Sequence, residues 1–421
     1  MLTHEQNELL CRVGPGTPMG KLARSYWLPL LRSETLLADG APQRIRVLGE
    51  NFVAFRATDG RVGLIDEACP HRGVSMALAR NGDCALTCLY HGWKVGVEGQ
   101  LLDAPSEPIE RREKFIKNIP VRHFPVREAA GVIWAYFGGG ETPKFPDWEF
   151  NSLPANQVKA IRGECKSNWL QGFETVLDSA HLGILHKSGI LASNVSSMDE
   201  LRLTLDMPPV FKVVRVPYGL KEGAIRGFND GTEYTRVREI VLPFFSFIPM
   251  RPGAVSQTFC YVPIDDYNHI LWTFYYHSDR PLEEGETIAP MLPGTYDNFA
   301  AGLGGFENMW RQDRARMEQG HWSGLPGTVP TEDVVIAESM GPIVDRSKEH
   351  LGTSDVVIAQ TRRRLLEMLR EQEEGTLSRD PADRIDYAHI RGISLRYRGI
   401  DWSTIDAFNP PENITDPVPT E

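Results

Sequence analysis

Short runs of alternating apolar and polar residues fill the first third of the chain and predict β-strands. Turn signals such as Asp59-Gly60 and Glu98-Gly99 lie between these runs, as in antiparallel hairpins. We therefore expect a small antiparallel β domain in this part of the chain. Its strands are predicted at residues 44–48, 52–56, 62–66, 94–97 and 131–137.

The pattern changes after residue 137. Three glycines at 138–140 are followed by prolines at 143, 146 and 154, which predicts a domain boundary between about 138 and 160. Beyond it, strands are expected between about 212 and 277, most clearly at 233–247 and 255–262. Helical spacing follows at 298–319, 331–339 and 354–374. Strands in one block with helices at its ends favour an α+β domain in which helices pack on a curved antiparallel sheet, a helix-grip arrangement.

These patterns predict three parts of the chain. Residues 1–25 form an N-terminal helical extension, whose first helix (3–13) opens with a capping box of Thr3 and Gln6. Residues 26–145 form the β domain, and residues 146–421 form the α+β domain.

Composition excludes some classes of function. A formal net charge of -11 argues against nucleic acid or an anionic membrane as the main partner, since both require clustered cations. Six cysteines in 421 residues are too few for a disulfide framework. The N-terminus has no secretory pattern, and no apolar run reaches the roughly 20 residues of a membrane span. We therefore expect a cytoplasmic protein.

The β domain carries a first cluster of candidate ligands. Cys69 and His71 are separated by one residue and Cys88 and His91 by two. A structural zinc site is one interpretation, but such sites usually pair the cysteines together and the histidines together. One cysteine and one histidine in each pair is instead the order expected for a [2Fe-2S] cluster with two cysteines on one iron and two histidines on the other.

A second cluster lies in the segment 168–187, whose apolar spacing predicts a helix. Asp178 and His181 are three residues apart and share a helix face, whereas His181 and His186 are about 140° apart around an ideal helix. A straight helix would not aim both histidines at one ion. We therefore predict a local irregularity, either a π-type bulge or a break near Gly183. Glu174 is interpreted as support for the helix face rather than as a ligand.

Together the two clusters resemble the motifs of Rieske non-haem iron oxygenases. The resemblance rests on the contexts Cys-Pro-His-Arg and Tyr-His-Gly-Trp in the first cluster and on Glu-x3-Asp-x2-His-x4-His in the second. It implies a Rieske cluster in the β domain, with the ligands Cys69, His71, Cys88 and His91. It also implies a mononuclear Fe(II) held by two histidines and a carboxylate, with open positions for dioxygen.

The resemblance assigns further roles near the iron. His181 and His186 match the histidine ligands directly, and the third ligand is an aspartate late in the chain, best matched by Asp355. Asp355 could equally be an idle carboxylate at a helix N-terminus, where it would interact with the helix dipole. Asp178 corresponds to a residue that links the catalytic iron of one subunit to a Rieske histidine, here His91, of its neighbour in a trimer. A plain structural acid is the alternative for Asp178.

Nearly the whole chain, and in particular residues 9–20 and 340–352, resembles the phthalate dioxygenase branch of that family. The resemblance implies a homotrimer or stacked trimers, and a reductase that carries flavin and a plant-type [2Fe-2S] centre and uses NADH. The implied reaction is cis-dihydroxylation of an aromatic carboxylic acid such as phthalate. Alternatives are O-demethylation of a methoxylated, lignin-derived acid and, in another class, a Rieske electron carrier with a ligand-binding domain. A structural zinc protein is the last alternative.

An aromatic carboxylate bound by an acidic protein needs a local cation. We expect the anchor to be Arg226, in a stretch similar to that branch. Strand alternation allows only some of the candidate arginines to face a cavity. The other candidates are Arg215, Arg236, Arg238 and Arg251.

Overall fold

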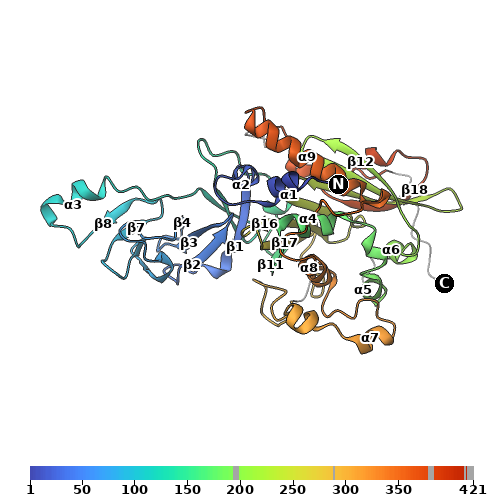
Figure 1. Cartoon of the computed structure of the whole chain (residues 1–421), viewed down its shortest axis with the longest axis horizontal. Helices are drawn as coiled ribbons and strands as arrows, with labels where there is room; N and C mark the ends of the chain where they lie inside the picture. The colour runs from blue at the N-terminus through green and yellow to red at the C-terminus, as the bar shows by residue number, and fades with distance from the viewer. Residues whose placement is uncertain (193–198, 288–289, 378–383, 412–413, 415–421) are drawn as a thin grey trace. The chain divides into compact units, whose positions relative to one another are not determined.

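The computed structural model describes residues 1–192, 199–287, 290–377, 384–411 and 414, and it has two compact units (Figure 1). The first unit is Val13–Phe145, and the second combines Met1–Arg12 with Pro146–Glu421. The N-terminal residues therefore do not form one separate extension. Helix α1 (His4–Cys11) packs in the second unit, and α2 (Pro18–Arg24) belongs to the first. The predicted capping box of Thr3 and Gln6 is present at the start of α1.

The first unit contains three small antiparallel sheets, in the orders β1-β10-β9, β2-β3-β4 and β5-β6-β7-β8. All five predicted strands occur, within two residues of their expected bounds. The three-residue strands β5, β6 and β8 were not predicted, because three residues are too few to show a period. Strands β1 and β9 and the eight-residue helix α3 (Ile109–Ile116) were not predicted either. The strands are β1 (Trp27–Arg32), β2 (Gln43–Val47), β3 (Glu50–Arg56), β4 (Val62–Asp66), β5 (Arg80–Gly82), β6 (Ala85–Thr87), β7 (Lys94–Gly96), β8 (Leu101–Asp103), β9 (Val126–Ala129) and β10 (Val132–Tyr136).

The second unit is built on an eight-stranded antiparallel sheet, which confirms the α+β prediction. Its order is β11-β17-β16-β15-β14-β13-β12, and β18 pairs with β14 beside β15. The central strands are buried on both faces, so they read as nearly continuous apolar runs, as in β17. The strands are β11 (Val158–Cys165), β12 (Val210–Val216), β13 (Gly219–Gly227), β14 (Glu233–Val241), β15 (Phe245–Ile248), β16 (Ser256–Pro263), β17 (His269–Tyr276) and β18 (Ile393–Tyr397).

Two predicted elements differ from the structure. The single strand expected at 233–247 is two strands, β14 and β15, which pair with each other around a turn at Leu242-Pro243. The helix expected at 298–319 is mostly absent, and only α7 (Arg314–Glu318) and an irregular turn (η6, Phe306–Arg311) occur there. Glycines with positive φ at Gly302 and Gly304 interrupt the helical pattern.

Five further helices occur in the described part of the second unit. The predicted helices at 331–339 and 354–374 correspond to α8 (Val329–Ser339) and α9 (Val356–Glu373). Helix α4 (Trp169–Leu177) packs against α8, β16 and β17, while α9 lies along β12 and β13 (Figure 1). Two short helices, α5 (Lys187–Ala192) and α6 (Asp199–Leu203), follow α4 in the chain.

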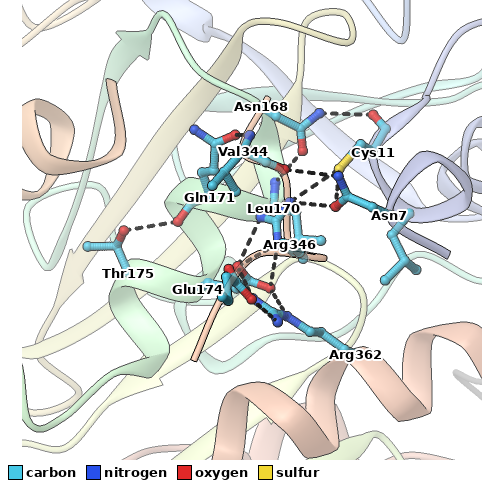
Figure 2. Close-up of polar contacts among 12 residues, drawn as sticks. Asn7, Cys11, Asn168, Leu170, Gln171, Glu174, Thr175, Val344, Arg346 and Arg362 are labelled. Carbon is cyan, nitrogen blue, oxygen red and sulfur yellow. Dashed lines mark hydrogen bonds and ion pairs between the residues drawn. The ribbon is translucent and has the colours of Figure 1, made fainter. Parts of the chain in front are cut away.

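A buried ion-pair cluster fixes α4 to its surroundings. Figure 2 shows the Glu174 carboxylate between the guanidinium groups of Arg346 and Arg362, with N–O distances of 2.6–3.2 Å. Arg362 also pairs with Glu349, and Arg346 donates to Asn7 on α1. Glu174 thus supports the helix, as predicted. Two cations and two anions thus balance in a largely buried site, in which only Glu349 is partly exposed.

We predict that Glu174→Gln destabilises the second unit by about 3–5 kcal/mol, because removing one partner leaves two buried guanidinium groups without their shared anion. Denaturant unfolding followed by tryptophan fluorescence measures the loss. The matched control is Glu367→Gln, which removes partly exposed ion pairs with Arg215 and Arg364 and should cost less than about 1 kcal/mol.

The same variant has an expected pH dependence. Burial alone would raise the pKa of Glu174, but Arg346 and Arg362 outweigh burial and lower it. The stabilisation is therefore fully present above the unfolded pKa of about 4.3 and is lost as pH falls through the lower folded pKa. The stability difference between wild type and Glu174→Gln should shrink below about pH 4. A constant difference down to pH 3 would contradict this account.

Candidate functional site

Two loops of the first unit hold the first cluster, as expected. The loop between β4 and β5 carries Cys69 and His71, and the loop between β6 and β7 carries Cys88 and His91. Both cysteines are buried, and the two imidazole rings have centroids 4.5 Å apart. The structure therefore brings together all four predicted ligands of this centre.

The two loops share one backbone design. In the first, the Cys69 N–H donates to the Val74 carbonyl and the Gly73 N–H donates back to Cys69. The second repeats these bonds from Cys88 to Trp93 and from Gly92 to Cys88. A glycine with positive φ closes each loop, at 79° for Gly73 and 74° for Gly92. Two matched loops can offer one thiolate and one imidazole each to a shared cluster.

The chemistry of the donors fits iron. Burial raises the pKa of the Cys69 thiol to about 11, and the neighbouring Cys88 thiol adds to that effect. Bound iron supplies the positive charge that holds such thiols as thiolates. Burial, followed by the charges of His71 and Arg72, lowers the pKa of His91, which favours the neutral imidazole that metal binding requires. The His91 Nδ1 atom is buried and has no hydrogen-bond partner among the described residues, as expected for a lone pair directed at a metal.

The second cluster begins where α4 ends. Asp178 has extended backbone angles and terminates α4, His181 opens a short 3-10 turn (η4, His181–Gly183), and His186 directly precedes α5. The predicted irregularity is therefore a break, and it starts at Asp178, five residues before Gly183. This break allows two histidines five residues apart to face one point.

Three donor atoms converge there. The His181 Nε2 and His186 Nε2 atoms are 3.0 Å apart, and Asp333 Oδ1 lies 2.9 Å from His186 Nε2 and 3.4 Å from His181 Nε2. Ligands about 2.1 Å from a metal and at right angles to each other are separated by about 3.0 Å. The three atoms thus lie close enough together to hold one metal ion, and they supply the two-histidine, one-carboxylate ligand set that is typical of non-haem Fe(II).

The third donor is Asp333 rather than Asp355, so the structure contradicts the prediction for Asp355. The Asp355 carboxylate accepts a 2.6 Å hydrogen bond from the Gly352 N–H at the start of α9. It therefore has the N-terminal helix role that was the alternative interpretation. Asp333 lies on α8 among apolar neighbours, and a charged residue in an apolar helix is expected to have a partner. That signal could have identified it in the sequence.

A second carboxylate holds each histidine from behind. Glu332 Oε2 lies 2.7 Å from His186 Nδ1, and Asp178 Oδ2 lies 3.7 Å from His181 Nδ1. Such partners fix the tautomer and orientation of a metal-bound imidazole. Glu332 in turn accepts a hydrogen bond from Ser323. Sequence reasoning missed Glu332, whose only signal is its place beside the buried Asp333.

The acidic groups make this centre a site for a cation. Burial alone would lower the pKa of His181, but Asp178 and Asp333 outweigh burial and raise it to about 9. The pKa of Asp333 is lowered by His186 and His181 despite the opposing effect of burial. In both cases the pocket favours positive charge, and a divalent metal satisfies the same carboxylates while its histidines stay neutral.

A cavity of about 420 Å³ adjoins this centre, with His181, Asp178 and Asp333 in its wall. Apolar side chains from several elements form much of the remaining wall, among them Ile248, Met250, Val255, Phe259 and Val329. Four arginines also line it: Arg236, Arg238, Arg251 and Arg280. This volume suits a single substituted aromatic ring.

The arginines differ in their charge partners. Arg238 pairs with the buried Glu222, and Arg280 pairs with Glu286. Arg236 is 7% exposed and makes no hydrogen bond or ion pair with a described residue, although its charge also acts on the buried Glu222 that pairs with Arg238. Arg251 likewise has no ion pair with any described residue.

The expected anchor, Arg226, is not part of the cavity wall. It shares a sheet face with Arg236, because Ala224 pairs with Arg236 and Arg226 is two residues further along β13. Its Nε, however, donates to the Met207 carbonyl, which lies in the segment before β12. Arg215 points elsewhere and pairs with Glu367 on α9. The structure therefore favours other members of the predicted set.

The fold and the two centres define a class of protein with a Rieske cluster and a mononuclear iron in one chain. Residues 26–123 match the family described as the Rieske [2Fe-2S] domain, and residues 135–407 match the LigXa C-terminal domain like family. The chain belongs to the Rieske oxygenase large subunits, the aromatic-ring-hydroxylating enzymes that carry these two cofactors.

Relatives of known activity cover almost the entire chain. It is 36% identical to the 3-chlorobenzoate-3,4-dioxygenase oxygenase subunit of Comamonas testosteroni, over 96% of this chain and 98% of that protein. It is 34% identical to the phthalate 4,5-dioxygenase oxygenase subunit of Pseudomonas putida, over 97% and 95%. In fold it is similar to dicamba monooxygenase bound to dicamba, with a TM-score of 0.55 and 16% identity over 84% of this chain and 99% of that one. No helix in the described ranges has the length and apolar character needed to cross a bilayer.

We predict that Asp333→Asn lowers mononuclear iron affinity by at least roughly 10-fold, because it removes a charged ligand atom. The measured iron content should fall from three atoms to two per chain, while the absorbance of the Rieske cluster is unchanged. Asp355→Asn is the matched control and should retain three irons. Loss of iron in Asp355→Asn but not in Asp333→Asn would restore the original prediction.

Proposed function

We propose that this chain is the oxygenase component of a two-component system that dihydroxylates the ring of an aromatic carboxylic acid such as phthalate. The observation that carries the proposal is the unpaired Arg236 guanidinium in an otherwise largely apolar cavity beside His181 and Asp333. An apolar cavity binds the ring. Arg236 and Arg238 share one buried anion, Glu222, so a buried guanidinium that makes no hydrogen bond of its own favours a ligand that brings a second carboxylate. The named substrates of two relatives, 3-chlorobenzoate and phthalate, are both aromatic carboxylates.

In this proposal His181, His186 and Asp333 hold the mononuclear iron, and Cys69, His71, Cys88 and His91 hold the Rieske cluster. The iron, when bound, supplies open positions at which dioxygen is activated by electrons from the Rieske cluster. The chain's own residues bind and orient the substrate.

Arg236 and Arg238 are two residues apart on β14 and project from the same face of the sheet. Arg238 donates to the Ser179 hydroxyl, next to Asp178, so it lies at the end of the cavity nearest the iron ligands. Arg236 is about 6–7 Å further along the strand. A carboxylate at Arg236 would therefore leave room for the ring to reach toward the iron, while the apolar wall excludes water.

We further propose the partners that the family resemblance implies. These are a reductase with flavin and a plant-type [2Fe-2S] centre that takes electrons from NADH, and a homotrimer or stacked trimers in the cytoplasm. Across each subunit interface, Asp178 would link His181 to the His91 of its neighbour. The position of Asp178, behind His181 and partly exposed, supports this role.

O-demethylation of a methoxylated aromatic acid is the second candidate. It is favoured by 30% identity, over 91% of this chain, to the 5,5'-dehydrodivanillate O-demethylase oxygenase subunit of a Sphingobium strain. A pure electron carrier is less well supported, because the three converging ligand atoms have no use in a carrier.

We expect purified protein with reductase, NADH and ¹⁸O₂ to place both labelled atoms in a cis-dihydrodiol of a benzoate or phthalate, with one NADH consumed per O₂. Mass spectrometry of the product and oxygen uptake provide the measurement. Release of formaldehyde from a methoxybenzoate, with one labelled atom in the formaldehyde, the other in water and none in the phenol, would select O-demethylation instead. No label in any aromatic acid of a broad panel would contradict the proposed function.

Arg236→Gln should raise KM for the aromatic carboxylate by roughly 10- to 100-fold, since a charge-assisted hydrogen bond contributes about 1.5–3 kcal/mol. Steady-state oxygen uptake measures it, and Rieske absorbance and iron content should not change. Arg226→Gln and Arg215→Gln are the matched controls. A rise in KM for Arg226→Gln alone would return the anchor to its originally predicted position.

A further inference from the structure

The side chain of Gln171 joins α4, the helix that precedes the histidine segment, to α8, the helix that carries Asp333. Its Nε2 donates to the carbonyl oxygens of Ala337 and Gly341, at 3.0 and 2.8 Å. Its Oε1 accepts from the Val344 N–H at 2.8 Å, a bond that Figure 2 also shows. Gln171 is 1% exposed. The carboxamide therefore uses both of its donors and its acceptor on backbone groups at and beyond the C-terminus of α8.

The position of this amide relates it to the iron site. Gln171 is in the first turn of α4, and Asp178, seven residues later, terminates this helix, so the amide is about two helical turns from the point where the histidine segment begins. On α8, Ala337 is one turn after Asp333 and lies on the same face. The bonds from Gln171 to α8 thus fix the axial position of Asp333 relative to the segment that carries the histidines.

Even a small shift of α8 along its axis, relative to α4, would move Asp333 away from the two histidines. A metal site requires its ligands to be held within about 0.5 Å of their working positions. Helices packed only through apolar side chains can slide by such a distance, since dispersion contacts have no strong directional preference. Hydrogen bonds from one rigid amide to two carbonyls do have such a preference.

We propose that Gln171 is a positioning residue that sets the reach of Asp333 to the mononuclear iron. It touches neither metal nor substrate, and it acts through the register of α8 on α4. The inference rests on the ligand set proposed above. Gln171 lies outside the metal-ligand motif, and its replacement should change the geometry of the iron centre more than the stability of the fold.

The chain offers a closely matched control on the same helix. Asn168, at the N-cap of α4, is also a fully buried amide. Its Nδ2 donates to the carbonyls of Cys11 and Asp266, at 2.9 and 2.8 Å, and its Oδ1 accepts from the Leu170 N–H. Its side chain therefore makes the same number and kind of bonds as Gln171, but none of them reaches α8.

The test compares Gln171→Met and Asn168→Leu, which remove the bonds with little change in volume. Each full-length protein is prepared with its Rieske cluster and reconstituted with ferrous iron. The measurements are the rate of iron loss to a ferrous chelator, the thermal midpoint, and the EPR signal of the nitric oxide adduct, whose rhombicity reports ligand geometry. Rieske absorbance gives the concentration of correctly folded first unit.

We expect both variants to lower the midpoint by similar amounts. Gln171→Met should lose the mononuclear iron roughly 10-fold faster than wild type and show an altered nitrosyl signal, a change of the size found when groups behind metal ligands are removed. Asn168→Leu should keep the wild-type iron-loss rate and signal. Equal iron loss and equal signals in the two variants would overturn the proposal and make Gln171 a purely structural residue.

If Gln171→Met does not fold, Gln171→Glu replaces it, because a carboxylate keeps the acceptor for Val344 but repels the two carbonyls. Faster iron loss in this variant supports the proposal, and an unchanged rate overturns it. Asp333→Asn separates the two levels of the argument. If it retains iron, the ligand set itself is wrong. If it loses iron while the Gln171 variants retain theirs, only the positioning role is wrong.

Discussion

The architecture of the catalytic unit depends on the buried carboxylate of Glu174 and the two guanidinium groups that enclose it. The three side chains come from α4, from the segment after α8 and from α9, so one anion joins parts of the chain up to 188 residues apart. Burying these charges is costly unless each is paired, and here every charge has a partner. The cluster also includes Asn7 of α1, which explains why the first twelve residues pack with the catalytic unit.

This anchoring allows the chain to leave helical geometry directly afterwards. Helix α4 ends at Leu177, and the following residues adopt the irregular path that aims His181 and His186 at one point. An irregular segment has few backbone hydrogen bonds of its own, and its shape must be imposed by its neighbours. The fixed end of α4 on one side and the carboxylates Asp178 and Glu332 behind the histidines provide that constraint.

Sequence reasoning was most successful where chemistry and local spacing coincide. The four Rieske ligands and the two histidines lie in short motifs, and the structure brings each set together. The prediction of Asp355 as the third iron ligand was wrong, because this ligand is distant in sequence from the two histidines. Only the packing of α8 against α4 identifies the aspartate that reaches them. The prediction that Arg226 anchors the substrate carboxylate is not supported, for a related reason. Strand alternation identifies the face of a residue but not whether another segment, here the one containing Met207, covers it.

The same distinction applies to the fold. Regular strands such as β4 were predicted to the residue, whereas the hairpin at Pro243 and the irregular turn at 306–311 were not. Apolar runs that are buried on both faces have no period to mark where one strand ends. Tertiary contacts, rather than local preference, decided those segments.

Helix α8 contributes to the iron centre twice, since Asp333 faces the metal position and the adjacent Glu332 holds the imidazole of His186. Asp333 and Glu332 cannot move away from the centre independently, because both belong to the same rigid helix. A displacement of α8 would therefore weaken the metal bonds of Asp333 and His186 together, so forms of the centre that have lost only one of these two bonds should be scarce.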